Sequence, residues 1–223
     1  MENHQRLVVL PGVYDGLGAA IARHVGAKAV YASGGAIARS FGLPDLGLVS
    51  MTEMADRLAS IVRAFAGPVI ADGDTGYGDT QHVRRMVQMF EAAGIQGLHI
   101  EDQDFPKRCG HHDGKRLIPS DAMARKIEAA VAARQSSNFL VIGRTDAIAI
   151  EGFDAAISRA QRMVEAGADV VFIEARKRWK ARRSVVLVAA VAAAGRRRWR
   201  WCGEAEAMVL LSLLSRLALV VGS

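Results

Sequence analysis

Two carboxylates separated by a single residue are the first feature of the sequence that could do chemistry. Asp72 and Asp74 flank Gly73 directly after an apolar run. Residues two apart in an extended chain point to the same side, so the carboxylates would offer hard oxygen ligands at one point. Mg²⁺ binds through one or two carboxylates and takes its other ligands from water and substrate. The pair is therefore a candidate Mg²⁺ site, and the alternative is an Asp-Gly turn without a metal.

A cysteine among charged residues is the second such feature. Lys107, Arg108, Cys109, Gly110 and His111 follow one another. A thiol beside cations and a histidine loses its proton more easily than a free cysteine, so this segment could transfer a proton. Its lysine and arginine could bind a carboxylate. The alternative is a basic loop with an incidental cysteine.

Charged residues also stand where apolar runs end. Glu101, Arg144 and Glu174 each follow a short apolar segment, and a charge buried there is costly unless it is paired or functional. A guanidinium such as that of Arg144 can hold a carboxylate through two N–H groups. An ion-pair network that only stabilises the fold is the alternative. His99 lies within an apolar run and is predicted to be a core residue rather than a ligand.

Short apolar runs and longer amphipathic stretches alternate up to Ala175. The runs are rich in β-branched residues, which favours buried strands, and several stretches carry helix-capping or helix-ending residues, with Thr52 and Ser120 as predicted caps. The predicted strands are residues 7–10, 29–32, 69–71, 97–100, 139–143 and 170–173, and the predicted helices are residues 52–65, 80–93, 120–134 and 153–166.

Two α/β folds fit this alternation, the doubly wound sheet and the closed (β/α)8 barrel, and the position of the polar residues decides between them. Polar segments follow the carboxyl ends of the predicted strands at 33–35, 72–74, 101–103, 144–146 and 174. A (β/α)8 TIM-type barrel gathers such ends into one mouth, where its active sites form. A doubly wound sheet would spread them along an edge, and no strand is followed by a G-x-G-x-x-G fingerprint. The sequence therefore predicts a (β/α)8 barrel that is incomplete at the C-terminus, because six units are found where about eight are needed.

The composition changes abruptly after Ala175. Residues 1–175 hold 18 Lys/Arg and 21 Asp/Glu, whereas residues 176–223 hold 11 Lys/Arg and 2 Asp/Glu, so the net charge of +6 comes from the tail alone. All three tryptophans also lie in the tail. We divide the chain into a barrel portion, residues 1–175, and an atypical basic and apolar tail, residues 176–223.

Two interpretations of the tail stay open. A reading-frame shift would explain why the pattern changes at one residue. A basic segment that binds nucleic acid is the less favoured alternative, since arginines with aromatic residues can contact phosphates and stack on bases. The apolar runs Ser184–Ala194 and Ala207–Val221 are shorter than a bilayer span, so no membrane partner is expected. The two cysteines, Cys109 and Cys202, are consistent with free thiols in the cytoplasm.

Six motifs of the chain match one enzyme family. The chain resembles the isocitrate lyase/phosphoenolpyruvate mutase superfamily, and most closely its methylisocitrate lyase branch, from about Val9 to Ala175. KRCGH at 107–111 is the most specific motif, and its cysteine favours C–C cleavage over phosphoryl transfer. The other motifs are YASGG (31–35), GLPDLG (42–47), ADGDTGYG (71–78), GLHIEDQ (97–103) and GRTDA (143–147).

The resemblance implies a Mg²⁺-dependent lyase, with Mn²⁺ as an alternative ion. It would cleave a 2-hydroxy di- or tricarboxylate by retro-aldol-type chemistry, giving pyruvate and succinate from a methylisocitrate-like substrate. Oxaloacetate decarboxylase or phosphonomutase activity, and an inactive frame-shifted chain, are the alternatives. Family members form homotetramers through C-terminal helices, and the tail of this chain does not resemble those helices.

The resemblance also implies roles for individual residues. Asp72 and Asp74 would hold the metal with Glu101 nearby, and Cys109 would be the catalytic acid or base. The residues that would assist Cys109 are Lys107, Arg108 and His111, and those that would bind the substrate are Ser33, Gly34, Gly35, Asp45, Gly110, Arg144 and Glu174.

Overall fold

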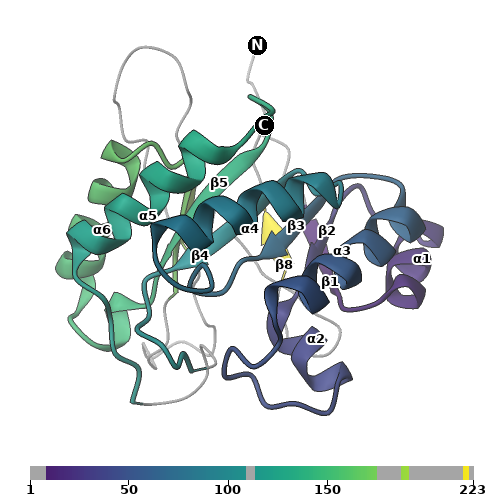
Figure 1. Cartoon of the computed structure of the whole chain (residues 1–223), viewed down its shortest axis with the longest axis horizontal. Helices are drawn as coiled ribbons and strands as arrows, with labels where there is room; N and C mark the ends of the chain where they lie inside the picture. Colours follow the sequence, from purple (N-terminus) through teal and green to yellow (C-terminus); the bar gives the residue numbers. More distant parts are fainter. Residues whose placement is uncertain (1–8, 109–113, 175–186, 191–217, 221–223) are drawn as a thin grey trace, which may run out of the picture.

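Six strands lie side by side in the order in which they follow one another in the chain (Figure 1). The structure, a computed structural model, describes residues 9–108, 114–174, 187–190 and 218–220. Each of the six strands is parallel to the next. They are β1 (Val9–Val13), β2 (Val30–Ala32), β3 (Val69–Asp72), β4 (Gly97–Glu101), β5 (Leu140–Thr145) and β6 (Val170–Ile173).

The predicted strands are confirmed from β2 to β6, whereas β1 lies further along the chain than predicted. The prediction was residues 7–10, but β1 continues through Pro11 and Gly12 to Val13. Proline and glycine weaken a strand interior. Only Gly12 and Val13 pair with β2, so Pro11 stands outside that ladder and does not interrupt it.

The described part of the chain contains six α-helices, of which four were predicted. The predicted helices are α3 (Met51–Phe65), α4 (Thr80–Ala92), α5 (Ser120–Ala133) and α6 (Phe153–Glu165). The helices not predicted are α1 (Gly16–His24) and α2 (Gly34–Ser40), and the short 3-10 helix η1 (Ala147–Ala149) follows β5. None of the helices in the described ranges has the length and apolar character needed to cross a membrane.

Side-chain caps explain where the two unpredicted helices begin. Asp15 Oδ1 accepts the N–H of Gly18 at 2.7 Å at the start of α1, and Ser33 Oγ accepts the N–H of Ala36 at 3.4 Å at the start of α2. Such bonds satisfy backbone donors that the first turn of a helix leaves unpaired. The glycines and alanines that fill both helices give little apolar periodicity, which is why the sequence pattern did not predict them.

Two predicted caps are wrong by one or two residues. The cap of α3 is Ser50 rather than Thr52, and it forms a capping box in which Ser50 and Glu53 bond each other's backbone N–H. The cap position of α5 is Pro119 rather than Ser120, and it makes no side-chain hydrogen bond. The prediction for α3 chose a residue of the first helical turn and missed the serine before it, and the prediction for α5 chose the first residue of the helix itself.

The core lies between the sheet and the inner faces of the helices. The buried residues of α3 recur at three- and four-residue spacing, which is the pattern of an amphipathic helix. Burying a large apolar side chain of this kind contributes about 1.5–3 kcal/mol. On the outer side of α1, by contrast, three apolar side chains stay exposed: Leu17, Ile21 and Val25. The buried residues of α3 and α4 are Met54, Leu58, Ile61, Phe65, Val83, Met86, Val87 and Phe90.

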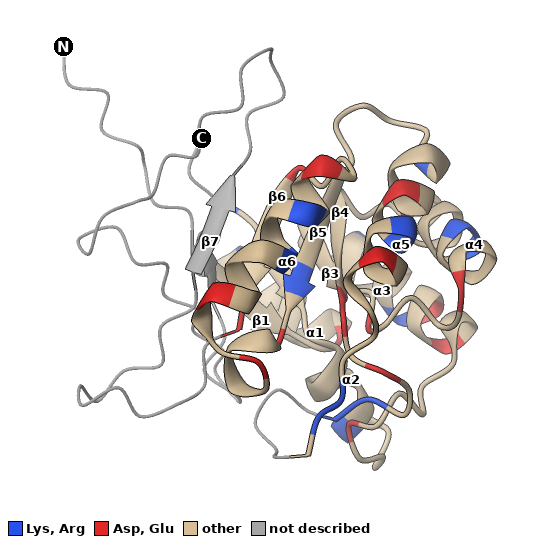
Figure 2. Cartoon of the chain, turned by 90° about the vertical axis from the view of Figure 1, so that its left-hand side faces the viewer, with Lys and Arg blue, Asp and Glu red and all other residues tan. Residues whose placement is uncertain are grey.

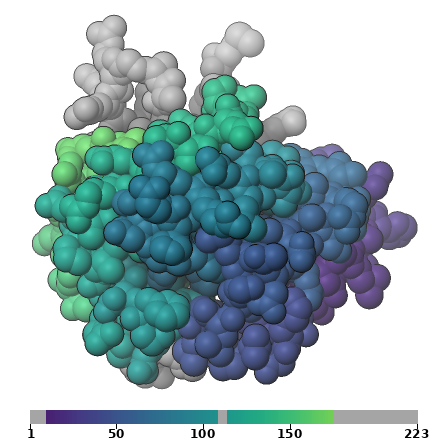
Figure 3. Space-filling view, in the orientation of Figure 1, coloured from purple at the N-terminus to yellow at the C-terminus, as the bar shows by residue number. Residues whose placement is uncertain are grey.

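The helices gather on one face of the six-stranded sheet (Figures 1 and 2). Right-handed crossovers between sequential parallel strands place every connecting helix on the same side. A doubly wound sheet would instead reverse its strand order at one point, and the order from β1 to β6 does not reverse. Successive units accordingly follow one another across the surface, as the colour bands of Figure 3 show. This is the arrangement of the first six units of a (β/α)8 barrel, as predicted.

Two further strands flank the sheet and run against its direction. β7 (Leu187–Ala190) pairs antiparallel with β6, and β8 (Ala218–Val220) pairs antiparallel with β1. A (β/α)8 barrel needs eight parallel strands in a closed ring, whereas the sheet described here has a linear order from β7 to β8. The described strands therefore leave the barrel incomplete, as predicted. The boundary at residue 175 falls outside the described residues and stays a prediction.

Candidate active site

The carboxyl end of β3 carries the two predicted metal ligands. Asp72 is the last residue of β3, and its carboxylate accepts the N–H of Gly34 at 3.1 Å and that of Asp74 at 2.9 Å. Asp74 has a φ of +50°, which is uncommon for residues other than glycine. Both side chains are buried. The chain therefore leaves the strand in a tight turn that keeps the two carboxylates together.

The start of α2 lies against two carboxylates. A Cβ atom on Gly34 would be 2.6 Å from Asp72 Oδ2, and a Cβ atom on Gly35 would be 2.6 Å from Asp45 Oδ2. Both distances are much shorter than a van der Waals contact, so each position requires glycine unless a carboxylate moves. Ser33 is buried at the cap of the same helix. The structure thus places Gly34 against the predicted metal ligand Asp72 and Gly35 against Asp45, with Ser33 at the start of the same helix.

Lys107 lies between carboxylates from two loops. Its Nζ is 2.5 Å from Asp45 Oδ1 and also contacts Asp74 Oδ1. Burial alone would lower the pKa of this lysine, but the surrounding acids, Asp74 and Glu101 foremost, raise it well above its ordinary value. The Lys107 ammonium is therefore charged at neutral pH. Because Lys107 is the first residue of KRCGH, this contact ties that segment to the predicted metal site.

Arg144 joins the ends of three neighbouring strands. Its guanidinium is 3.3 Å from Glu101 Oε2, 3.2 Å from Asp146 Oδ2 and 3.6 Å from Glu174 Oε2. It also lies 5.0 Å from the centroid of the Phe172 ring, within the range of a cation–π interaction. The ion-pair network that the sequence left as an alternative is therefore present. The network lies at the carboxyl ends of β4, β5 and β6, at the same edge of the sheet as Asp72 at the end of β3, so it belongs to the candidate site.

Burial raises the pKa of two of the three acids at this site. It raises the pKa of Glu101 to about 8 although Arg144 opposes this, and it raises the pKa of Asp74 to about 6 although Lys107 opposes it. Burial would raise the pKa of Asp72 as well, but the side chains around that residue lower it to about 2. Asp72 is thus ionised at neutral pH without further help. A bound cation would favour ionisation of the other two acids.

Tyr31 and His99 form a buried pair behind Asp72. The tyrosine hydroxyl is 2.6 Å from His99 Nε2, which is itself 3.5 Å from Asp72 Oδ1. Burial lowers the pKa of His99 to about 4, so the imidazole is neutral at pH 7. The predicted core position of His99 is confirmed, although its contact with a candidate ligand was not foreseen. Its Nδ1 finds no hydrogen-bond partner among the described residues.

The relationship of the chain to known proteins agrees with this arrangement. The family model described as phosphoenolpyruvate phosphomutase matches residues 1–196, which is most of the chain. The chain belongs to this family. The resemblance predicted from the six motifs is thereby confirmed. The matched range also extends past residue 175, where the composition of the chain changes.

Relatives within the phosphoenolpyruvate phosphomutase family carry the names of lyases. The chain is 47% identical over 166 residues to a probable 2-methylisocitrate lyase 1 of Corynebacterium glutamicum, covering 74% of this chain and 54% of the relative. It is 48% identical over 169 residues to a 2-methylisocitrate lyase of Aeropyrum pernix, covering 76% and 54%. The chain therefore spans about half the length of the curated relatives it matches.

Solved structures of related enzymes have the same fold. A 2,3-dimethylmalate lyase superposes with a TM-score of 0.75 at 40% identity, covering 80% of this chain and 60% of that one. An oxaloacetate acetylhydrolase in complex with 3,3-difluorooxalacetate gives 0.74 at 40% identity, covering 78% and 61%. A phosphonopyruvate hydrolase in complex with oxalate and Mg²⁺ gives 0.71 at 34% identity, covering 79% and 60%.

The acids of this family member are suited to a hard cation such as Mg²⁺. No group of three His, Cys, Asp or Glu side chains within the described ranges is gathered closely enough to hold a metal ion by itself. Mg²⁺ does not require such a group, since it keeps several waters and binds through one or two carboxylates plus substrate. Glu101 Oε1 is buried with no hydrogen-bond partner in the described part, so an acceptor is left for a cation or its water. Asp72, Asp74 and Glu101 therefore fit the predicted metal.

The KRCGH segment is only partly described. Lys107 and Arg108 are placed, and Arg108 has an exposed side chain. Cys109, Gly110 and His111 lie outside the described residues, so their predicted roles stay predictions. The chain resumes at Gly114, where a Cβ would be 3.3 Å from Arg108 Nη1.

Several polar residues of the site were not singled out from the sequence. Asp102, Gln103 and Asp146 are almost fully buried directly behind the predicted residues, and Lys115 and Lys126 are buried as well. Asp102, Gln103 and Asp146 stand in the polar segments that follow β4 and β5, and that position could have identified them as site residues. Nothing in the sequence around the two lysines predicts burial. Lys115 pairs with Asp146, and Lys126 donates to the carbonyl of Thr75 at 2.7 Å.

Proposed function

We propose that this chain carries the larger part of the active site of a Mg²⁺-dependent C–C lyase. Its substrate would be a 2-hydroxy di- or tricarboxylate of the methylisocitrate type, and its products pyruvate and succinate. The cluster of buried acids with Lys107 and Arg144 at the strand ends carries this proposal. The lyase names of relatives at 47% and 48% identity support it.

Binding of a polyanionic substrate follows from the two buried cations. Arg144 presents several N–H donors, and a substrate carboxylate would compete for them with Glu101 and Glu174, whose oxygens lie at 3.3 and 3.6 Å. These contacts are long for charge-assisted hydrogen bonds, which are usually about 2.7–2.9 Å. A substrate carboxylate could therefore approach more closely than the acids now do.

Cleavage requires a proton to leave the 2-hydroxyl and another to reach the new carbanion. Asp72 and Asp74 would hold Mg²⁺, which would supply stabilisation of the oxygen that becomes a ketone. A base would accept the proton that leaves the 2-hydroxyl. The electrons of the broken C–C bond stay on the succinate fragment, and Cys109 would donate the proton that this carbon needs. Lys107 would stabilise the negative charge of the transition state from its place between Asp45 and Asp74.

Hydrolysis of a smaller oxo acid is the second candidate function, because two structurally similar enzymes are named as hydrolases. The solved structures include an oxaloacetate acetylhydrolase and a phosphonopyruvate hydrolase, whose names indicate smaller substrates. The KRCGH cysteine favours the lyase. A panel of 2-methylisocitrate, 2,3-dimethylmalate, oxaloacetate and phosphonopyruvate would rank these substrates by kcat/KM.

The decisive test is release of pyruvate from 2-methylisocitrate by the purified chain, followed with a coupled dehydrogenase. We expect release that needs Mg²⁺ and stops in EDTA. Cys109→Ser should lower kcat by at least about a hundredfold, since general acid–base groups typically contribute 10²–10⁴-fold. Cys202→Ser is the matched control and should leave the rate unchanged. Pyruvate release that is equally fast in EDTA would contradict the proposal.

A cytoplasmic location completes the proposal and comes from the sparse cysteines. The homotetramer that the resemblance implies for the family is not expected of this chain, because its tail does not resemble the C-terminal helices through which family members associate. Sedimentation velocity of the purified chain would measure the assembly state. A monomer would show that the tail does not replace the helices through which family members associate.

A further inference from the structure

A single carboxylate behind the candidate site holds residues from three places in the chain. Asp146 has no exposed surface. Its Oδ1 accepts from Lys115 Nζ at 2.5 Å and from Arg144 Nη2 at 3.3 Å. Its Oδ2 accepts from Arg144 Nε at 3.2 Å and from Gln103 Nε2 at 3.5 Å. All three partners are buried, so none of these bonds competes with bulk water.

Gln103 extends this contact to the segment that carries Cys109. Its side-chain oxygen accepts the backbone N–H of Arg108 at 2.9 Å, and its Nε2 donates to the backbone carbonyl of the same residue at 3.0 Å. One amide therefore holds both backbone groups of the residue that precedes Cys109. The amide is itself oriented by its contact with Asp146.

Lys115 makes the corresponding contact where the chain returns. Gln103 and Leu117 form an isolated antiparallel bridge, and the N–H of Asp104 donates to the carbonyl of Arg116 at 2.8 Å. The chain leaving at residues 103–104 and the chain returning at residues 116–117 thus lie side by side. The carboxylate of Asp146 contacts a side chain of each.

We infer that Asp146 is a positioning residue that fixes Arg144 and both ends of the Cys109 segment in one arrangement. It does so directly for Arg144 and Lys115, and through Gln103 for Arg108. The effect on turnover rests on the proposed lyase function, whereas the effect on the segment does not. A carboxylate with two cationic partners is suited to this task, because removing it would leave the buried Lys115 without its carboxylate and Arg144 with only its longer contacts to Glu101 and Glu174.

Hydrogen exchange of the Arg108 amide tests the inference without reference to activity. This N–H donates to Gln103, so its exchange reports whether the end of the segment is held. In the full-length chain, Asp146→Asn and Gln103→Met should each accelerate this exchange by at least tenfold. Exchange at the wild-type rate in Asp146→Asn would overturn the inference, whatever the enzyme does. Gln103→Met retains every buried charge, and should Asp146→Asn fail to fold, wild-type exchange in Gln103→Met would still overturn the link through which Asp146 acts on Arg108.

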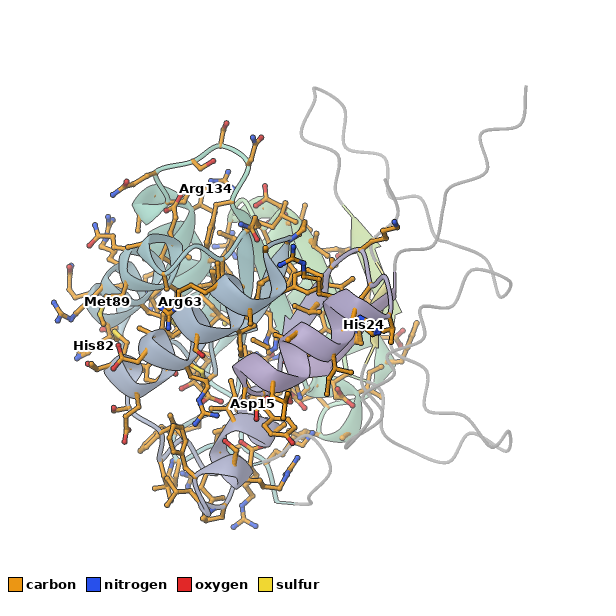
Figure 4. All side chains as sticks on the ribbon, turned by 90° about the vertical axis from the view of Figure 1, so that its right-hand side faces the viewer. Asp15, His24, Arg63, His82, Met89 and Arg134 are labelled. Carbon is orange, nitrogen blue, oxygen red and sulfur yellow. The ribbon has the colours of Figure 1, made fainter. Side chains whose placement is uncertain are left out.

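A matched control separates positioning from general loss of stability. Asp169→Asn removes a carboxylate that also holds an arginine, since its Oδ2 is 2.6 Å from Arg134 Nη1. That pair lies at the amino ends of the strands, since Arg134 ends α5 and Asp169 precedes β6, whereas the site lies at their carboxyl ends. In Figure 4, Arg134 is accordingly far from Asp15, which follows the carboxyl end of β1. The control should leave the Arg108 amide at its wild-type exchange rate. Acceleration equal to that in Asp146→Asn would show that any lost ion pair has this effect and would overturn the inference.

The two variants should also differ in their kinetics. Gln103→Met leaves Arg144 on Asp146, so kcat should fall about tenfold while KM stays within twofold. Asp146→Asn releases Arg144 as well, so KM for the carboxylate substrate should rise by about tenfold in addition. Identical effects of the two variants on kcat and KM would contradict the separate action on Arg144. A chain without lyase activity would refute the proposed function and leave the exchange experiment to decide the positioning role.

Discussion

A methyl group is the smallest side chain that could replace the hydrogen at position 34, and there is no space for it. The helix α2 starts so close to β3 that Gly34 donates its N–H to Asp72, and a Cβ would lie 2.6 Å from the same carboxylate. The predicted metal ligand Asp72 can keep this position only because Gly34 has no side chain. A Cβ on Gly35 would likewise lie 2.6 Å from Asp45 Oδ2.

Gly34→Ala should therefore weaken metal binding more than it weakens the fold. The alanine would displace the Asp72 carboxylate, and loss of a group that orients a ligand typically costs 10–100-fold in metal affinity. Titration of Mn²⁺ followed by electron paramagnetic resonance would measure this change. Gly16→Ala is the control, since its Cβ would lie 3.1 Å from the Ser60 hydroxyl, which can rotate away. Equal Mn²⁺ affinity in wild type and Gly34→Ala would refute the close-approach argument.

Residue types and spacing predicted most of the site. Asp72, Asp74, Glu101 and Arg144 were found because charged residues at the ends of apolar runs are rare without a reason. The convergence of Lys107 on Asp45 and Asp74 could not be predicted, since it depends on how two loops meet across the strand ends. Asp146 was equally hidden. It was visible as a polar residue after β5, but two of its partners, Gln103 and Lys115, lie more than thirty residues away.

At the scale of elements, helix starts depend on single polar side chains that periodicity does not reveal. The apolar spacing of α3 is clear, yet its first turn is set by the reciprocal bonds of Ser50 and Glu53. In α1 and α2 the cap is the main local signal, because glycine and alanine carry little apolar pattern. Predictions based on periodicity therefore found the long helices and missed the two short ones.

Ser50→Ala should destabilise the protein, whereas Thr52→Ala should not. Removing an N-cap serine typically costs about 1 kcal/mol, and Thr52 is an exposed residue inside the helix. Urea denaturation followed by circular dichroism would measure both variants. A larger effect of Thr52→Ala would restore the cap expected from the sequence.

The effect of Ser50→Ala should also depend on pH. The hydrogen bonds from Ser50 lower the pKa of Glu53 below its ordinary value of 4.5. A group with a lowered pKa in the folded state stabilises the fold above its unfolded pKa, and this stabilisation is lost as the pH falls through the folded value. The difference between wild type and Ser50→Ala should therefore be constant near neutral pH and shrink below about pH 4.5. A difference that grows on acidification would contradict the capping box.

At the scale of the whole molecule, the described part has six barrel units and two antiparallel flanking strands. The chain also spans about half the length of the curated relatives it matches. The sequence predicted an incomplete barrel from its count of units and from the change after Ala175. It could not predict that β7 pairs antiparallel with β6 and β8 with β1. These strands have only four and three residues, and such short segments show no pattern that indicates their direction.

A frame shift remains our hypothesis for the change after Ala175, and the gene can test it. Another reading frame beyond that codon should encode an acidic helix followed by two more strand–helix units. A chain rebuilt with that frame should close the barrel and show a higher Tm by differential scanning calorimetry than the present chain, because closure removes both sheet edges. The control is a chain ending at Ala175, which should not gain stability. The absence of family-like sequence in every other frame would reject the hypothesis.

The burial of lysines has a practical consequence for handling the protein. Of the lysines in the described ranges, Lys107, Lys115 and Lys126 are each at most 9% exposed, and Lys28 is the exposed one. An ester that couples to free amines would therefore react at Lys28, which follows α1 and precedes β2, before it reached those three. A chain anchored to a sensor chip in this way would keep Lys107 and Lys115 unmodified, so ligands could be measured on the immobilised protein.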